Sequence, residues 1–225
     1  MTGTSTVVIL ISPCRGWQAR RILTILTPKK RAGAGMTAFE FFTVLLSFVV
    51  SLGVASMLLA VTGLIQESLR VQFSLSYALW AAAIFDLQIT FWLKSWTYHE
   101  AYALRIETSV PPLLLAIIAF VACGLATPRI PDTGQIDLRA FHARQGRKYQ
   151  VAYAVFMVVA IAQLWLMRNM ADDSSNLVVD SIILAVLAVI AVAAAILHRL
   201  RWVQILAPAI LLASALTFYG RLMER

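Results

Sequence analysis

Charged residues are scarce in this sequence. They make up 13% of the 225 residues, whereas soluble domains carry about a quarter, and apolar residues make up 60%. The mean hydropathy of the whole chain is +0.80. This composition excludes an ordinary soluble domain and predicts a polytopic membrane protein.

Cysteine and histidine are also rare, and their positions exclude the usual metal and disulfide patterns. Cys14 lies in the N-terminal tail and Cys123 inside an apolar run, so neither a disulfide framework nor a CxxC ligand pair can be built. His99, His142 and His198 stand at the ends of apolar runs or in connecting segments, without a second ligand at metal spacing. We therefore expect solvated histidines at the membrane interface and neither a metal nor a cofactor.

Catalytic motifs are absent as well. The sequence contains no Ser-His-Asp order, no paired histidine ligands and no glycine-rich phosphate loop, so we do not expect an enzyme. The formal charge of +8 would suggest nucleic-acid binding in a soluble chain. Here the basic residues lie in turns between apolar runs, where anionic lipid headgroups attract them. The expected partner is the bilayer rather than nucleic acid.

Long apolar runs are what the sequence does contain. Windows of about 20 residues, the length that crosses the hydrocarbon core, predict six spans. They lie at about 40–65, 73–95, 108–127, 150–168, 177–198 and 202–220. Because lipid cannot satisfy free backbone groups, all six should be helices. The predicted fold class is all-α, a polytopic transmembrane helix bundle.

One connection, 128–148, is long and basic. Pro128 ends the preceding helix, and Asp137 can cap the next one. Leu138, Phe141 and Tyr149 would give the following segment an apolar side. We therefore predict a separate basic interfacial helix whose cations contact phosphate headgroups. These cations are Arg139, Arg144, Arg147 and Lys148.

The first 35 residues differ from the rest. They contain no acidic residue, six basic residues and an apolar stretch, "VVILI", that is too short for a signal-peptide core. Met36 stands directly before the first span, and the preceding "AGAG" can be encoded by codons that resemble a bacterial ribosome-binding site. We expect residues 1–35 to be an unstructured extension that is not translated, and 36–225 to form the transmembrane domain.

The start site also decides the predicted orientation. From Met36 onward, eight Lys and Arg residues lie on the side of the first, third and fifth turns, against five on the other side. Residues 1–35 would raise the second count to eleven and reverse the orientation. The acidic, polar turn "RNMADDSSN" suits an outside loop. We therefore predict a cytoplasmic 128–148 connection and both termini outside.

A single aspartate interrupts the run "LWAAAIFDLQITFWLKSW" of the second span. An ionised carboxylate in hydrocarbon costs several kcal/mol unless it is paired, so Asp86 needs a partner. The antiparallel first span carries small polar residues, and at equal depth Asp86 is level with Ser51 and one turn from Ser47. We expect Asp86 to hydrogen-bond to one of these two serines.

Three interpretations follow from the sequence, and two of them concern Asp86. Asp86 could be a structural residue that joins the first two helices through a hydrogen bond. It could be a proton or cation site of a small transporter or channel, with Gln88, Thr90 or Gln163 as polar lining. The chain could also be a membrane-embedded interaction or sensing protein, with a second copy or another membrane protein as its partner.

Three segments carry a resemblance to a known group of proteins. They are "FEFFTVLLSFVVSLGVASML", "LWAAAIFDLQITFWLKSW" and "DLRAFHARQGRKY". They resemble segments of uncharacterised bacterial multi-pass membrane proteins of about this size, over roughly Met36 to Trp165. The resemblance implies a bacterial inner-membrane protein that begins at Met36, and it carries no activity and no site residue.

Overall fold

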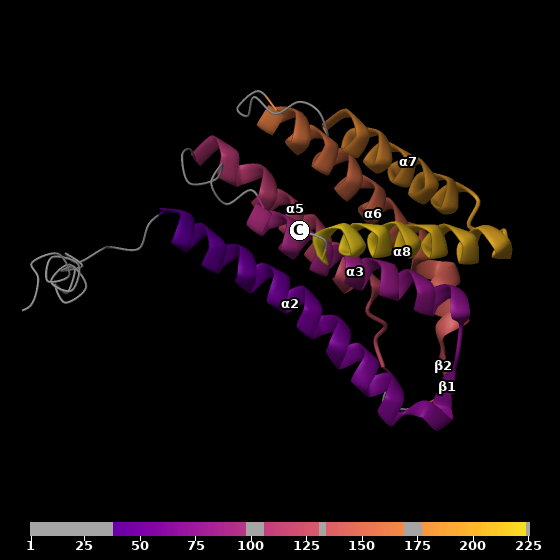
Figure 1. Cartoon of the computed structure of the whole chain (residues 1–225). Helices are drawn as coiled ribbons and strands as arrows, with labels where there is room; N and C mark the ends of the chain where they lie inside the picture. Colours follow the sequence, from indigo (N-terminus) through magenta and orange to yellow (C-terminus); the bar gives the residue numbers. More distant parts are fainter. Residues whose placement is uncertain (1–37, 98–105, 131–133, 169–176, 224–225) are drawn as a thin grey trace, which may run out of the picture. The chain divides into compact units, whose positions relative to one another are not determined.

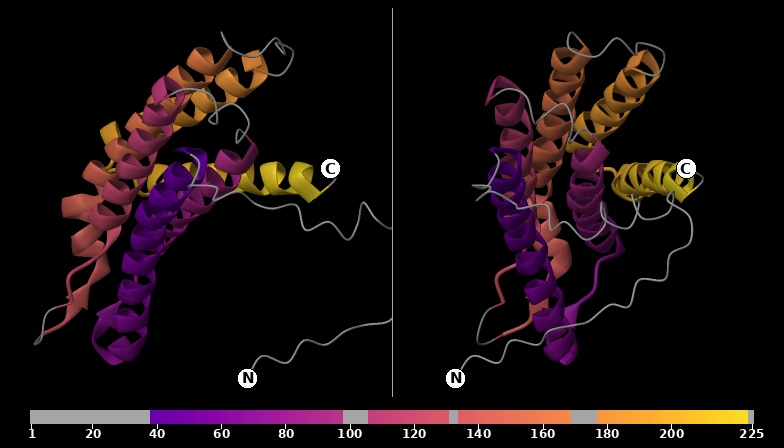
Figure 2. Two further views of the ribbon diagram at one scale, coloured as in Figure 1. Left: turned by 90° about the vertical axis from the view of Figure 1, so that its left-hand side faces the viewer. Right: turned by 60° about the vertical axis from the view of Figure 1, so that its left-hand side comes forward.

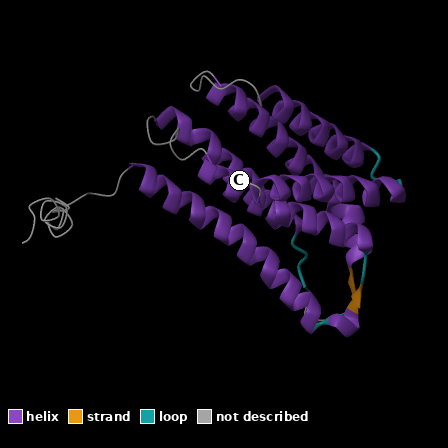
Figure 3. Cartoon of the chain, viewed as in Figure 1, coloured by secondary structure: helices purple, strands orange, loops and turns teal. Residues whose placement is uncertain are grey.

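The computed structural model describes residues 38–97, 106–130, 134–168 and 177–223, and this part of the chain is almost entirely helical (Figure 3). Its long helices are α2 (Ala38–Gln66), α3 (Leu75–Thr97), α5 (Ile106–Ala126), α6 (Leu138–Arg168), α7 (Leu177–Ile196) and α8 (Arg201–Met223) (Figure 1). A short 3₁₀ helix, η1 (Ser68–Arg70), and two strands, β1 (Val71–Gln72) and β2 (Ile136–Asp137), complete it. The predicted extension 1–35 and His99 lie outside the described residues.

Four of the described helices are long and apolar enough to cross a membrane. The qualifying stretches are Glu40–Gln66, Leu75–Ser95, Leu138–Leu166 and Val178–Ile196. The apolar parts of α5 and α8 are shorter, Val110–Ala126 and Arg201–Thr217. The predicted all-α fold with apolar helices of spanning length is therefore confirmed, whereas spans at 108–127 and 202–220 are not.

Helix α8 departs most from the expected arrangement. It packs chiefly against α3 and crosses the direction of the other helices steeply, as both views of Figure 2 show. Helices α6 and α7 pack side by side, as do α5 and α6, and α2 and α5. The apolar run of the expected sixth span therefore forms a helix that lies across the bundle.

The core forms around α3, and alanines let its neighbours approach closely. Trp80 and Ile84 of α3 are fully buried, and so are Ala119 of α5 and Ala191 of α7. Small residues at helix interfaces permit the close backbone contact on which membrane-helix packing depends. Large apolar side chains such as Leu59 of α2, which is 73% exposed, point outward as lipid-facing residues do.

The predicted interfacial helix is not a separate element, because α6 runs without a break from Leu138 to Arg168. The predicted cap is confirmed: Asp137 Oδ1 accepts hydrogen bonds from the backbone N–H groups of Arg139 (2.8 Å) and Ala140 (2.9 Å). Strand β2 pairs in parallel with β1, with Val71 opposite Ile136.

The apolar side of this basic segment packs against protein rather than along a bilayer surface. Leu138 is buried in a small cluster with Tyr77 and Ile136, against which Phe141 packs, and Tyr149 is fully buried. Burial of these side chains in the bundle explains why the segment continues α6. The four predicted headgroup-binding cations are all exposed, namely Arg139, Arg144, Arg147 and Lys148.

Candidate intramembrane binding site

Asp86 is half-buried near the middle of α3 and is bonded to the last helix. Its Oδ1 accepts a hydrogen bond of 2.9 Å from the hydroxyl of Tyr219 in α8. The hydroxyl oxygens of Thr90 and Tyr219 are also 2.9 Å apart. Tyr219 has one hydroxyl hydrogen, which goes to Asp86, so Thr90 is the donor in the second bond. Thr90 therefore donates to Tyr219, and Tyr219 donates in turn to the Asp86 carboxyl group.

The expected pairing of Asp86 with Ser51 or Ser47 is wrong. Ser51 is exposed, and its hydroxyl donates to the Ser47 carbonyl oxygen of the same helix at 2.7 Å. The Ser47 hydroxyl donates to the carbonyl oxygen of Thr43 at 2.6 Å. The physical reason is the rotation of α2 about its own axis. Buried Gly53, rather than exposed Ser51, meets α3.

Gln88 has the structural role that was considered for Asp86. It is fully buried, and its Nε2 donates to the Val50 carbonyl oxygen of α2 at 3.3 Å. The thiol of Cys123 in α5 donates to Gln88 Oε1 at 3.8 Å. A Cβ atom at Gly53 would lie only 3.1 Å from Gln88 Nε2, so the glycine makes room for the amide. Gln88 thus joins α2, α3 and α5 and belongs to the packing between them.

Asp86 also opens on a cavity of about 210 Å³ enclosed mainly by α3, α6, α7 and α8. Two of the residues predicted as polar lining, Thr90 and Gln163, share this cavity with Asp86. Apolar side chains, including Phe91 and Phe156, form much of the wall. The polar and charged lining includes Asp86, Thr90, Lys94, Tyr153, Gln163 and Asp180.

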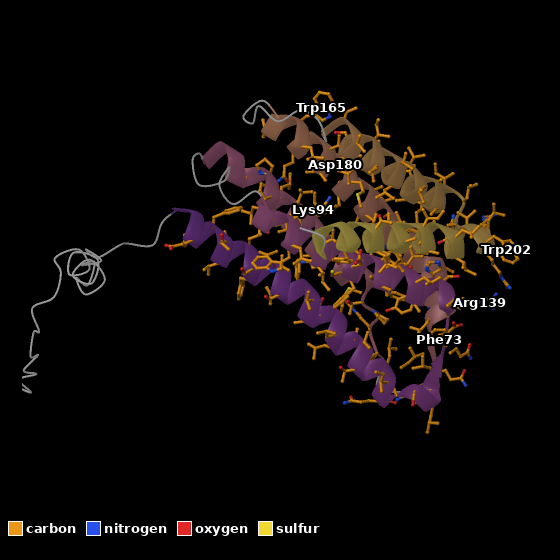
Figure 4. All side chains as sticks on the ribbon, in the orientation of Figure 1. Phe73, Lys94, Arg139, Trp165, Asp180 and Trp202 are labelled. Atoms are coloured by element: carbon orange, nitrogen blue, oxygen red, sulfur yellow. The ribbon has the colours of Figure 1, made fainter. Side chains whose placement is uncertain are left out.

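The cavity occupies one half of the bundle. It is lined by the C-terminal halves of α3, α6 and α8 and by the first turns of α7. Residues 169–176 connect α6 to α7, so the end of α6 and the start of α7 lie at the same end of the bundle (Figure 1). Arg139 lies toward the opposite end from Lys94 and Asp180 (Figure 4). The helical rise of about 1.5 Å per residue places Lys94 about 12 Å from Asp86 along α3.

Among the described residues, three charged side chains line the cavity, and two of them have opposite charges that interact. Lys94 of α3 and Asp180 of α7 interact electrostatically across the space between their helices. Asp86 accepts a hydrogen bond from the neutral hydroxyl group of Tyr219 and lies about 12 Å along α3 from Lys94. An ionised Asp86 therefore leaves the cavity with one net negative charge.

Sequence reasoning missed Asp180 and Tyr219. The run "LVVDSIILAVLAVIAV" contains a carboxylate three residues after the start of α7, and the criterion that selected Asp86 would also have selected Asp180. Tyr219 had no comparable signal, because it stands near the end of the last apolar run and meets Asp86 only through the crossing of α8 over α3. A second intramembrane carboxylate strengthens the interpretation as a functional site.

Three aromatic rings pack against one another beside the cavity. Tyr153, which lines it, packs edge-to-face on Trp80, with ring centroids 6.2 Å apart. Trp80 also contacts Tyr149, again with ring centroids at 6.2 Å. Trp80 and Tyr149 are fully buried. The three rings connect the cavity wall to a second polar cluster, which includes Tyr149.

The second cluster corrects the expectation for His142. This histidine is half-buried, and its Nε2 lies 3.1 Å from Gln204 Oε1, while its Nδ1 is hydrogen-bonded to the Tyr149 hydroxyl. Gln204 Nε2 donates to the Ala194 carbonyl oxygen at 2.7 Å, and its amide also pairs with that of Gln150. His142 is therefore held in a network between α6, α7 and α8. Of the two histidines within the described residues, His198 is the one that is exposed as expected.

The donor set does not favour a resident metal. Within the described residues, no group of three or more His, Cys, Asp or Glu side chains is arranged to hold a metal ion.

Comparison of the chain with known protein families, curated proteins and solved structures gives no match. The geometry and chemistry of the cavity are therefore the features that bear on function.

Proposed function

We propose that this protein is a small bacterial inner-membrane transporter or channel that binds a proton or a cation at Asp86. The observation that carries the proposal is that Asp86, Thr90 and Gln163 line one cavity between membrane helices. Ionisable residues inside membrane bundles commonly mark ion and substrate pathways. The resemblance to bacterial multi-pass membrane proteins supports the proposed location.

The contrast between two polar residues of α3 favours a functional role for Asp86. Gln88 is fully buried among α2, α3 and α5, as expected for a residue that only joins helices. Asp86, two residues earlier, faces an open space and is more costly to place in a membrane than an amide. A carboxylate is not needed for packing where a neighbouring amide already performs it.

The proposed orientation places Arg139 and its basic neighbours in the cytoplasm and the half of the bundle that contains the cavity toward the opposite side of the membrane. The charge count from Met36 supports this orientation. Trp165 and Trp202 are exposed near opposite ends of the bundle, as interfacial tryptophans are (Figure 4). In this orientation the exposed cations of α6 can contact anionic headgroups.

Flux measurements on proteoliposomes test the proposed function. Vesicles that contain the full chain should take up protons or a monovalent cation down an imposed gradient, and Asp86→Asn should abolish this flux. Glu67→Gln is the matched control, because it removes a carboxylate that pairs with Arg70 outside the membrane-spanning stretches. Flux that is unchanged in a folded Asp86→Asn protein would contradict the proposal.

A membrane-embedded interaction or sensing protein is the second candidate. One face of α2 favours it, because Ser51 and Ala55 are exposed there and small residues allow another helix to approach closely. A second copy of the chain or another membrane protein could occupy this face. Co-purification of a stable partner in the absence of flux would select this candidate.

A further inference from the structure

We propose that the cavity binds a small organic ammonium ion with an apolar body, and that Asp86 releases a proton when the ion binds. The inference rests on the proposed function and adds the class of substrate to it. Three properties of the cavity carry the inference: its charge, its walls and its size.

The charge of the cavity selects a monocation. Within the described lining, Lys94 and Asp180 balance each other, so the charge that a ligand has to neutralise there is that of Asp86. The Asp86 Oδ1 atom already accepts the Tyr219 hydroxyl hydrogen. The carboxylate retains further acceptor capacity, which one ammonium N–H group can use.

The walls favour an organic ion over a hydrated metal ion. Phe91 and Phe156 pack edge-to-face, with ring centroids 5.8 Å apart, and both line the cavity. Leu187 and Leu211 extend the apolar wall. Ca²⁺ and Mg²⁺ take six or more oxygen ligands, whereas an organic ammonium needs one acceptor for its N–H group and apolar contact for its body. The lining matches the second set of requirements.

The size of the cavity limits the ligand. Its volume of about 210 Å³ is smaller than the roughly 300–1,000 Å³ of pockets that enclose drug-sized molecules. A primary amine with one aromatic ring, such as 2-phenylethylammonium, is of suitable size. The four-ringed cation tetraphenylphosphonium is not, so the pair of ions tests the size limit.

Proton exchange follows from the cost of an unneutralised carboxylate in an apolar cavity. In the empty cavity the proton on Asp86 keeps the side chain neutral. When R–NH₃⁺ enters, the Asp86 O–H bond breaks, the proton leaves to water, and the carboxylate accepts an ammonium hydrogen bond. One positive charge enters and one leaves, and no electrons are transferred.

The other ionisable groups around Asp86 remain in place during this exchange. Within the described residues, these groups come from four packed helices. They are Lys94 of α3, Tyr153 of α6, Asp180 of α7 and Tyr219 of α8. Lys94 and Asp180 interact electrostatically with each other, and the Tyr219 hydroxyl donates to the Asp86 carboxyl group.

Calorimetry on the purified full-length protein tests the proposal. Titration with 2-phenylethylammonium in two buffers of different ionisation enthalpy measures both the Kd and the protons released. We expect binding with release of one proton, and a Kd that rises about tenfold for each unit of pH decrease where Asp86 carries its proton. Asp86→Asn should abolish binding and release, while Glu67→Gln should leave both unchanged.

The outcomes separate this proposal from the proposed function. Absence of 2-phenylethylammonium binding, together with Asp86-dependent proton or cation flux in vesicles, would overturn the substrate class and leave the proposed function standing. Binding without proton release would overturn the exchange step. Tight binding of tetraphenylphosphonium would overturn the size limit. Binding and flux that are both insensitive to Asp86→Asn would overturn both proposals.

Discussion

The hydroxyl of Tyr219 donates a hydrogen bond of 2.9 Å to Asp86 Oδ1, across 133 residues of sequence. This bond joins the steeply crossing α8 to the middle of α3 and orients the carboxyl group at the cavity. A variant that lacks this hydrogen bond separates the contribution of the Asp86–Tyr219 pair to stability from the proposed role of Asp86 in binding.

Tyr219→Phe removes the donor and keeps the ring. We expect a loss of about 0.6 kcal/mol, and at most about 1.7 kcal/mol, in the free energy of unfolding, because hydrogen bonds between membrane helices contribute amounts of this size. Reversible unfolding in mixed detergent micelles measures it. In a double-mutant cycle with Asp86→Leu, the two losses should be less than additive. Full additivity would show that the two side chains do not interact.

Gly53→Ala should destabilise the contact between α2 and α3, because the new Cβ would approach Gln88 Nε2 to 3.1 Å and Gln88 Cδ to 3.3 Å. A matched control is Gly124→Ala in α5, where nothing lies within 4 Å of the new Cβ. We expect a loss of about 1–3 kcal/mol for the first, as in overpacked cores, and no loss for the second. Equal melting temperatures of the two variants in detergent would contradict the close approach at Gly53.

Asp137→Ala should weaken the start of α6 by about 0.5–2 kcal/mol, because the carboxylate accepts the N–H groups of Arg139 and Ala140. Asp137→Asn keeps an acceptor and should cost little. Amide hydrogen exchange measures the effect, with faster exchange confined to the first turn of α6 in the alanine variant. Equal exchange in both variants would mean that the cap does not stabilise the helix.

The predicted orientation can be measured with single cysteines at Arg144 and Lys148, which are exposed on α6. In a background in which Cys14 and Cys123 are replaced, these positions should resist a membrane-impermeant thiol reagent in intact cells and react after lysis. The physical reason is the excess of cations on this side of the membrane. Labelling of intact cells would reverse the proposed orientation.

Some features of the fold could be predicted because their cause is local. Apolar runs of spanning length predict helices in lipid, and four described helices have the required length and hydropathy. The cap at Asp137 was predicted for the same reason, since its partners are two and three residues away. Hydropathy could not predict that the last apolar run crosses the bundle, because composition is unaffected by helix direction.

A bundle of apolar helices with a carboxylate near the middle of one of them can be predicted from the amino-acid sequence. The partner of each polar residue depends on the tertiary structure. Asp86 and Gln88 are two positions apart on α3, and a helix advances about 100° per residue, so they face different neighbours. Rotation of α2 placed Gly53 against Gln88, and the crossing of α8 placed Tyr219 against Asp86. Helix rotation and crossing depend on packing over the whole interface, which no local pattern encodes.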